Sequence, residues 1–443
     1  MMRNWLARVG LGRPELRAWA MYDWANSAFM TTIVAAVFPI YFSAEVAADL
    51  PREVATVWFS TVTTIALLSV AVLAPVLGAI ADYAAVKVKM LGAFLALGVV
   101  ATASMFFIGR GDWLLASLLF ALANIGASGS FVFYDSLLPH LATGEEIDRV
   151  STAGYALGYI GGGVLLAVNL AWIQFPDVFG LGGGDLAVRV SFVSVAIWWL
   201  GFSIPLFRTV REPARTLEMD ERVGSNPVRV AFTRLGETLH ELRGYRQAFL
   251  MLLAFLVYND GISTIIRMAT IYGTEIGIGR SELIAALLVT QFTGIPFAFL
   301  FGVLAARIGS RPSIFLALSV YLVISVLGYF VSTAAHFFVL AILVGTVQGG
   351  SQALSRSLFA SMIPRHKSAE FFGFFAVFEK FAGILGPAIF GMTTALTGSS
   401  RNAILSIIAF FVIGGWLLSR VDIEEGRRAA RAADEALLTA PVP

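Results

Sequence analysis

Seven ionisable side chains lie inside stretches of this chain that are otherwise apolar and long enough to cross a membrane. They are Asp23, Asp135, Asp260, Arg267, Arg356, Glu379 and Lys380. A charged side chain at the centre of a bilayer costs about 2.5–3.5 kcal/mol, so each is expected to face protein, water or a passing solute. Four acids against three bases leave one carboxylate without an internal partner. That carboxylate is a candidate to bind a proton.

Asp260 and Arg267 carry the clearest prediction of a solute site. They are seven residues apart, so they point to one helix face but lie about 10.5 Å apart along the axis. A partner from another helix, or a solute between them, fits that distance better than a direct ion pair. An anion and a cation so placed suit the two ends of a zwitterion, and structural pairing is the alternative. Asn259 adds a hydrogen-bonding amide beside them.

The other five charges lie toward one end of their spans, which leaves three interpretations open. They can form an inner gate of salt bridges, bind substrate or a proton, or simply sit at the membrane interface. Asp23 is ambiguous, because Asn26 one turn later makes the same helix face polar. The candidate pathway is completed by Tyr22, Gln348 and Gln352.

The composition indicates an all-α integral membrane protein. Hydrophobic residues make up 58% of the 443 and charged residues only 14%, against about 25% charged in soluble proteins. The apolar runs are near twenty residues long, the length of helix that spans a bilayer, and their backbone must bond internally. With no cysteine and with all four histidines in loops or at span ends, no metal or other cofactor is expected. The net charge of +2 does not suggest a nucleic-acid partner.

The sequence predicts twelve transmembrane helices in two six-helix bundles. The expected spans are 18–43, 55–80, 90–109, 113–136, 151–173, 187–207, 247–272, 282–305, 313–333, 336–359, 370–396 and 402–419. The expected organisation is an N-terminal bundle (1–207), a cytoplasmic linker (208–246), a C-terminal bundle (247–419) and a cytoplasmic tail (420–443). Within the linker, apolar residues spaced three and four apart from Val228 to Leu242 predict an amphipathic helix along the membrane surface.

The orientation follows from the Lys and Arg residues in the loops. Placing both termini in the cytoplasm puts 23 of these residues inside and 5 outside. Since positive charge is retained on the cytoplasmic side, both termini are expected there.

The two halves of the chain repeat each other. Gly302 near the end of the eighth span follows Gly78 of the second span by 224 residues. A second pair of matching segments, 135–139 and 360–364, has an offset of 225. Two matches in register predict a duplicated six-helix unit, in which one half rocks against the other around a site at the bilayer midplane.

These features resemble the major facilitator superfamily. Gly78, the acid Asp82 four residues later, and the basic residues beyond it look like the motif of that superfamily between its second and third helices. The resemblance implies that Gly78 lets helices approach, and that Asp82 with Lys87 or Lys89 latches the cytoplasmic gate. The second copy of the motif has Ala306 where the first has its acid.

Three segments resemble a narrower branch of that superfamily, the UMF branch. They read YDWANSAF at residues 22–29, GYALGYIGGG at 154–163 and QGGSQALSRS at 348–357. This branch is similar to the autophagy-linked vacuolar amino-acid exporters of fungi. The resemblance implies a secondary transporter of an amino acid or related metabolite. Such a transporter is expected to work by alternating access, as a monomer in the bacterial inner membrane.

The same sequence bears on other classes of function. An enzyme is not expected: Gly126-Ala127-Ser128-Gly129 matches a protease serine motif, but no span holds a histidine base in its interior. Without a nucleotide-binding loop, the driving force should be an ion gradient, with protons as the expected partner. Two alternatives stay open, a lipid or lysophospholipid flippase of the same superfamily and a non-transporting membrane sensor or scaffold.

Overall fold

The computed structural model describes residues 6–144, 146–182, 185–215, 230, 245–383 and 385–439. Every regular element within these residues is a helix. Twelve helical stretches among them are long and apolar enough to cross a membrane, as the sequence predicted. Except for residue 230, the amphipathic helix expected between Val228 and Leu242 lies outside the described residues.

Six of these stretches precede the linker and six follow it. The first half comprises α2 (Pro14–Ala28), η1 (Phe29–Val37), α3 (Phe38–Tyr41), η2 (Phe42–Val46), α4 (Arg52–Ala84), α5 (Lys87–Ser104), η3 (Met105–Phe107), α6 (Trp113–Leu141), α7 (Glu146–Gln174), η4 (Pro176–Phe179) and α8 (Leu186–Thr209). The second half comprises α10 (Arg246–Glu275), α11 (Arg280–Ile308), α12 (Ser310–Tyr329), α13 (Ala334–Ala360), η5 (Arg365–Lys367), α14 (Ser368–Phe381), α15 (Leu385–Thr397), α16 (Ser400–Ser406) and α17 (Ile408–Ser419). A last helix, α18 (Ile423–Thr439), follows them.

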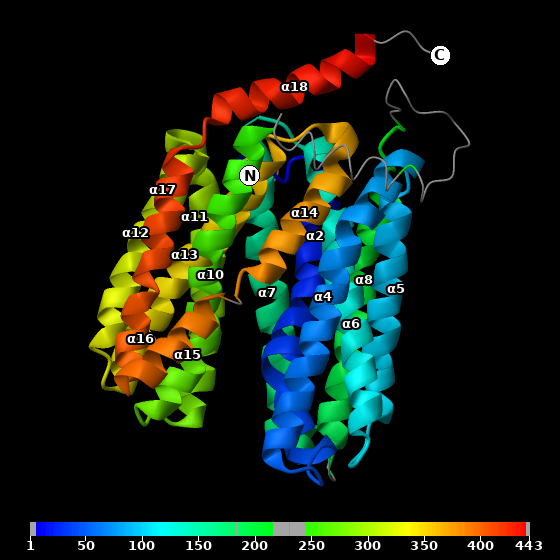
Figure 1. The fold of residues 1–443 in the computed structure, drawn as a ribbon. Coiled ribbons are helices and arrows are strands. Elements are labelled where there is room, and N and C mark those ends of the chain that lie inside the picture. The colour runs from blue at the N-terminus through cyan, green and yellow to red at the C-terminus, as the bar shows by residue number, and fades with distance from the viewer. Residues whose placement is uncertain are drawn as a thin grey trace.

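Figure 1 shows the two halves side by side, with α18 lying across one end of the molecule. We call this end the α18 end. The halves pack together through α4 against α14 and α7 against α11. Glycines make these contacts close: a Cβ on Gly78 would lie 2.2 Å from the carbonyl oxygen of Ala369 on α14. Small residues of this kind are what lets membrane helices approach without a hydrophobic driving force.

The eleventh span is broken between α14 and α15, as its glycines and proline suggested. Gly383 in the break has a φ of +104°, a backbone angle that residues other than glycine rarely adopt. Before the break, α14 packs against α4 and α6 of the first half; after it, α15 packs mainly against α10 and α16 of its own half. The eleventh span therefore contacts the first half before the break and mainly its own half after it. Figure 1 shows α14 and α15 on either side of the break.

The first span is also irregular, and its sequence did not predict this. Its middle, Phe29–Val37, is a π-helix. Such stretches are rare and frequently occur at functional sites. Here the irregular turn carries Thr31, Ala35 and Ala36, which line the cavity described below.

Candidate substrate and proton pathway

Arg356 on α13 of the second half reaches into the first half and binds two acids there. Its Nη1 lies 3.0 Å from Asp135 Oδ1, and its Nη2 lies 3.3 Å from Asp23 Oδ2. Arg356 and Asp23 are buried, and the hydroxyl of Tyr134 donates a further bond to Asp23. Two carboxylates thus share one guanidinium. When both are ionised, the group carries a net negative charge.

Aromatic and serine side chains of the first half complete the surroundings of Arg356. Its guanidinium carbon lies 4.9 Å from the ring centre of Trp19 and 4.7 Å from that of Tyr155. Nε also donates to the Ser151 hydroxyl at 2.9 Å. The sequence reasoning missed these three neighbours, because apolar spans are full of aromatic and small residues. Together these aromatic contacts and this hydrogen bond orient the guanidinium and offset part of the cost of burying its ion pairs.

Gly154 is the feature of the sequence that makes room for this cluster. A Cβ at this position would lie 2.4 Å from Asp23 Oδ2 and 3.2 Å from the Trp19 ring. Asp23 can therefore reach Arg356 only because α7 presents no side chain at this point. The row of glycines at 154, 158 and 162 packs α7 closely on the first span, as expected.

Gln348, Gln352 and Arg356 form one polar stripe along α13, since they are spaced four residues apart. Gln352 Nε2 lies 3.5 Å from the Asn259 side-chain oxygen on α10, which brings together two of the predicted pathway residues. Gln348 lines a cavity one turn further from the α18 end. The stripe therefore connects the cavity to the Arg356 cluster.

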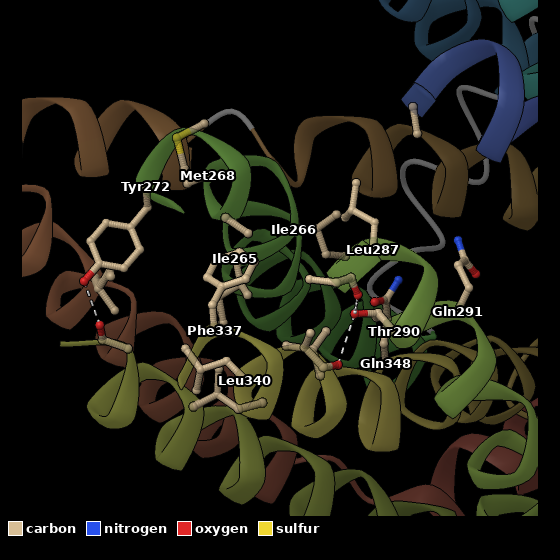
Figure 2. A pocket seen from close by; sticks show the side chains of 18 of the residues that line it. Ile265, Ile266, Met268, Tyr272, Leu287, Thr290, Gln291, Phe337, Leu340 and Gln348 are labelled. Atoms are coloured by element: carbon tan, nitrogen blue, oxygen red, sulfur yellow. Dashed lines mark hydrogen bonds between the residues drawn. The ribbon is translucent and has the colours of Figure 1, made fainter. Parts of the chain in front are cut away.

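The cavity has a volume of about 210 Å³ and lies mainly between α10, α11 and α13, with one wall from the first half (Figure 2). None of the described residues that line it is acidic or basic, and this lining is mostly apolar. Two of its polar groups are already bonded: Thr290 to the carbonyl oxygen of Ala341, and Tyr272 to that of Gly328. The carboxamides of Gln291 and Gln348 are the remaining large polar groups, and Gln291 Oε1 is buried without a partner among the described residues.

Asp260 and Arg267 both bind the break in the eleventh span. Asp260 Oδ1 accepts the backbone N–H of Gly383 and of Gly386, at 2.6 and 3.0 Å. Arg267 Nη1 donates to the Gly383 carbonyl oxygen at 3.3 Å. Each residue thus has a backbone partner in another span, and a role for the pair in solute binding stays a prediction. Neither residue lines the cavity, and Arg267 is exposed.

The remaining predicted pathway residues lie apart from the direct contacts of Arg356. Tyr22 and Asn26 are buried within the first half, where the Tyr22 ring packs on Tyr134 at 4.9 Å. Glu379 and Lys380 on α14 are partly exposed and form a pair of their own at 3.6 Å. The contacts do not assign these four residues to binding, and that role stays a prediction.

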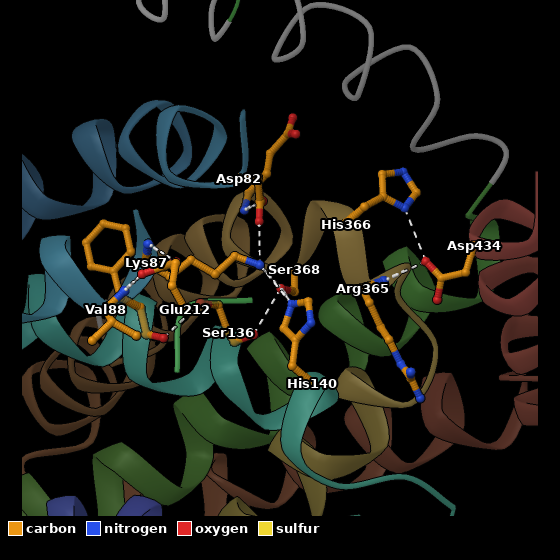
Figure 3. A network of polar contacts seen from close by, with 12 residues as sticks. Asp82, Lys87, Val88, Ser136, His140, Glu212, Arg365, His366, Ser368 and Asp434 are labelled. Carbon is orange, nitrogen blue, oxygen red and sulfur yellow. Dashed lines mark hydrogen bonds and ion pairs between the residues drawn. The ribbon is translucent and has the colours of Figure 1, made fainter. Parts of the chain in front are cut away.

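The predicted latch at the end of α4 spans the boundary between the halves (Figure 3). Asp82 pairs with Lys87 at 2.7 Å and accepts the backbone N–H of Glu370, at the start of α14, at 2.8 Å. Lys87 Nζ also donates to the Ser368 hydroxyl at 2.8 Å. Of the two basic residues predicted for the latch, Lys87 makes these contacts and Lys89 is exposed outside them, while their role in gating stays a prediction.

Lys87 is held in place by two residues that were not predicted from the sequence. The Glu212 carboxylate accepts the backbone N–H groups of Lys87 and Val88, at 2.6 and 2.8 Å, and so caps the start of α5. The other, His140, has its Nε2 2.8 Å from Lys87 Nζ. The histidines carried no sequence signal for this role, since they lay at span ends.

Solved structures share this fold. The structure of the proton:xylose symporter XylE aligns with a TM-score of 0.69 and 11% identity, covering 97% of this chain and 99% of that one. The transporter FucP in the outward conformation aligns with a TM-score of 0.66 and 13% identity, covering 93% of this chain and 100% of that one. The twelve spans of this chain therefore adopt the fold seen in these structures of the major facilitator superfamily.

The chain belongs to the family of vacuole effluxer Atg22-like proteins, whose family model matches residues 46–431. It is 38% identical over 409 residues to a Bacillus subtilis protein described as an uncharacterized MFS-type transporter, YxiO, covering 92% of this chain and 94% of that one. It is 24% identical over 460 residues to autophagy-related protein 22 of Coccidioides immitis, covering 87% of this chain and 76% of that one. The resemblance noted in the sequence is thereby confirmed, and the protein is a multi-pass membrane transporter of a small-molecule substrate.

Proposed function

We propose that this protein is a proton-coupled secondary active transporter of the bacterial inner membrane, working by alternating access as a monomer. An amino acid or a related metabolite is the favoured cargo. The observation that supports coupling most directly is the position of Arg356: a cation of the second half shared by Asp23 and Asp135 of the first.

The distribution of Lys and Arg supports placing the α18 end in the cytoplasm. The Arg356 cluster and the Asp82 latch then join the two halves on the cytoplasmic side of the cavity, which gives an outward-facing conformation. To release solute into the cytoplasm, the second half must move away and withdraw Arg356 from the first.

Withdrawal of Arg356 leaves two buried carboxylates without their cation. Breaking a buried pair in this way costs about 3–5 kcal/mol, because an uncompensated charge is left behind. A proton bound to Asp23 or Asp135 neutralises one of the two carboxylates and so lowers that cost. Protonation from outside therefore lowers the barrier to opening inward, which couples the transport step to the proton gradient.

The cavity supports a cargo whose side chain is uncharged and mostly apolar. Burying an unpaired charge among such groups is costly, and the two glutamines offer only neutral hydrogen bonds. Among amino acids, this lining favours apolar side chains over acidic or basic ones. The same apolar lining keeps a lysophospholipid flippase as the second candidate.

Reconstituted uptake tests this proposal. Purified protein in proteoliposomes would be offered leucine, phenylalanine, lysine, glutamate, short peptides and lysophosphatidylcholine, with and without an inward proton gradient. We expect accumulation of leucine or phenylalanine that collapses with a protonophore. Movement of lysolipid alone would favour the flippase, and no gradient-dependent movement of any solute would contradict the proposal.

A further inference from the structure

Gly78 and Gly302 occupy matching places at the two boundaries between the halves. A Cβ on Gly78 would lie 2.2 Å from the Ala369 carbonyl oxygen at the start of α14. A Cβ on Gly302 would lie 2.2 Å from the Thr152 hydroxyl in the first turns of α7. In each case, the end of a helix in one half meets the beginning of a helix in the other. The repeat seen in the sequence is therefore also a repeat of contacts.

The two boundaries differ in where an acid is available. Four residues after Gly78, Asp82 crosses the boundary and binds the start of α14. Four residues after Gly302, Ala306 has no group that can do this. The motif alone therefore predicts no latch at the second boundary.

An acid on the opposite side of the second boundary makes the missing connection. Asp148, in the first turn of α7, is buried. Its Oδ1 accepts the Ser357 hydroxyl of α13 at 2.5 Å, and its Oδ2 accepts the Ser310 hydroxyl of α12 at 2.6 Å. Both serines belong to the second half. Hydrogen bonds to a carboxylate are about twice as strong as neutral ones, so these two contacts join the halves firmly.

We propose that Asp148, with Ser310 and Ser357, is a second gate latch, in which the acid lies at the start of α7 instead of at the end of α11. Ser357 directly follows Arg356 on α13. Movement of α13 away from the first half therefore opens this latch and the Arg356 cluster in one step. The latch rests on the proposed function, because it stabilises the conformation that is closed at the α18 end.

The absence of cysteine from the sequence makes a direct test practical. Spin labels would be placed on the exposed Lys89→Cys and Ser419→Cys, at the start of α5 and the end of α17, and the distance between them measured in nanodiscs without substrate. Asp148→Asn should increase the population with widely separated labels, relative to the unmutated pair, by about tenfold, as expected for the loss of charge-assisted bonds. Asp177→Asn, an exposed acid in the connection between α7 and α8, serves as the control and should leave the distances unchanged.

Two further variants keep the test decisive if Asp148→Asn fails to fold. Ser357→Ala and Ser310→Ala each remove one bond and should shift the distances in the same direction by a smaller amount. Unchanged distances in folded variants would overturn the latch. The measurement needs no transport, so a shift in a protein that moves no solute would support the latch while removing the proposed function.

Discussion

Arg356 Nη1 lies 3.0 Å from Asp135 Oδ1, and this contact joins residues that are 221 positions apart and in opposite halves. It lies at one end of a polar stripe that begins in an uncharged cavity and follows α13 through Gln352. A connection of this kind allows events at the cavity to affect the ion pairs that hold the halves together.

Replacing Arg356 alone should destabilise the protein more than replacing Arg356 together with one of its two acids. Arg356→Gln leaves Asp23 and Asp135 buried without a cation, which should lower the free energy of unfolding by about 3–5 kcal/mol. Adding Asp135→Asn to that variant should restore part of the loss. Thermal unfolding in detergent measures both effects. Arg428→Gln, on the exposed face of α18, is the control, and equal melting temperatures for all the variants would refute the role of the cluster.

The structural role of Asp260 predicts different effects for two substitutions. Asp260→Asn keeps an oxygen that can accept the N–H groups of Gly383 and Gly386, so the free energy of unfolding should change by less than about 1 kcal/mol. Membrane insertion should be normal. Asp260→Ala leaves those groups without their acceptor and should cost about 1–3 kcal/mol. Unfolding by heat compares the two variants. Equal losses would show that the charge, rather than the bonds to the break, matters there.

Filling the cavity should stop transport without disturbing the gate. Ala35 lines it from the first half, so Ala35→Phe should reduce solute uptake more than tenfold while leaving the melting temperature within a few degrees. Val72→Phe is the matched control, because Val72 is 71% exposed on α4. Full uptake by Ala35→Phe would place the solute elsewhere.

The two lysines of the motif should behave differently. Lys87→Gln removes the ion pair with Asp82 and should raise the population opened at the α18 end, measured by the accessibility of a single introduced cysteine to a maleimide. Lys89→Gln should have no effect, because Lys89 is exposed outside the latch. A larger effect from Lys89 would contradict the assignment of Lys87.

The sequence predicted the features that depend on local pattern. Length and hydropathy gave all twelve spans, and Gly383, Gly386 and Pro387 indicated the break that the structure places between α14 and α15. The resemblance between Gly78 and Gly302 predicted two repeats, and both glycines lie at the boundary between the halves.

The sequence could not predict contacts that depend on how the halves meet. Charge counting indicated a gate of ion pairs, but pairing Arg356 with both Asp23 and Asp135 requires three helices in place. Asp148 was overlooked because the motif directed attention to Ala306, on the other side of the boundary. The π-helix at Phe29–Val37 has no glycine or proline within it to reveal it.

Gradient-driven accumulation by Asp135→Asn tests the central claim most directly. Proteoliposomes with the unmutated protein should accumulate solute when a proton gradient is imposed and should exchange it when none is present. If Asp135 shares the coupling proton with Asp23, the variant should keep exchange and lose accumulation by at least tenfold. Accumulation by Asp135→Asn at the unmutated level, still dependent on the proton gradient, would contradict the account.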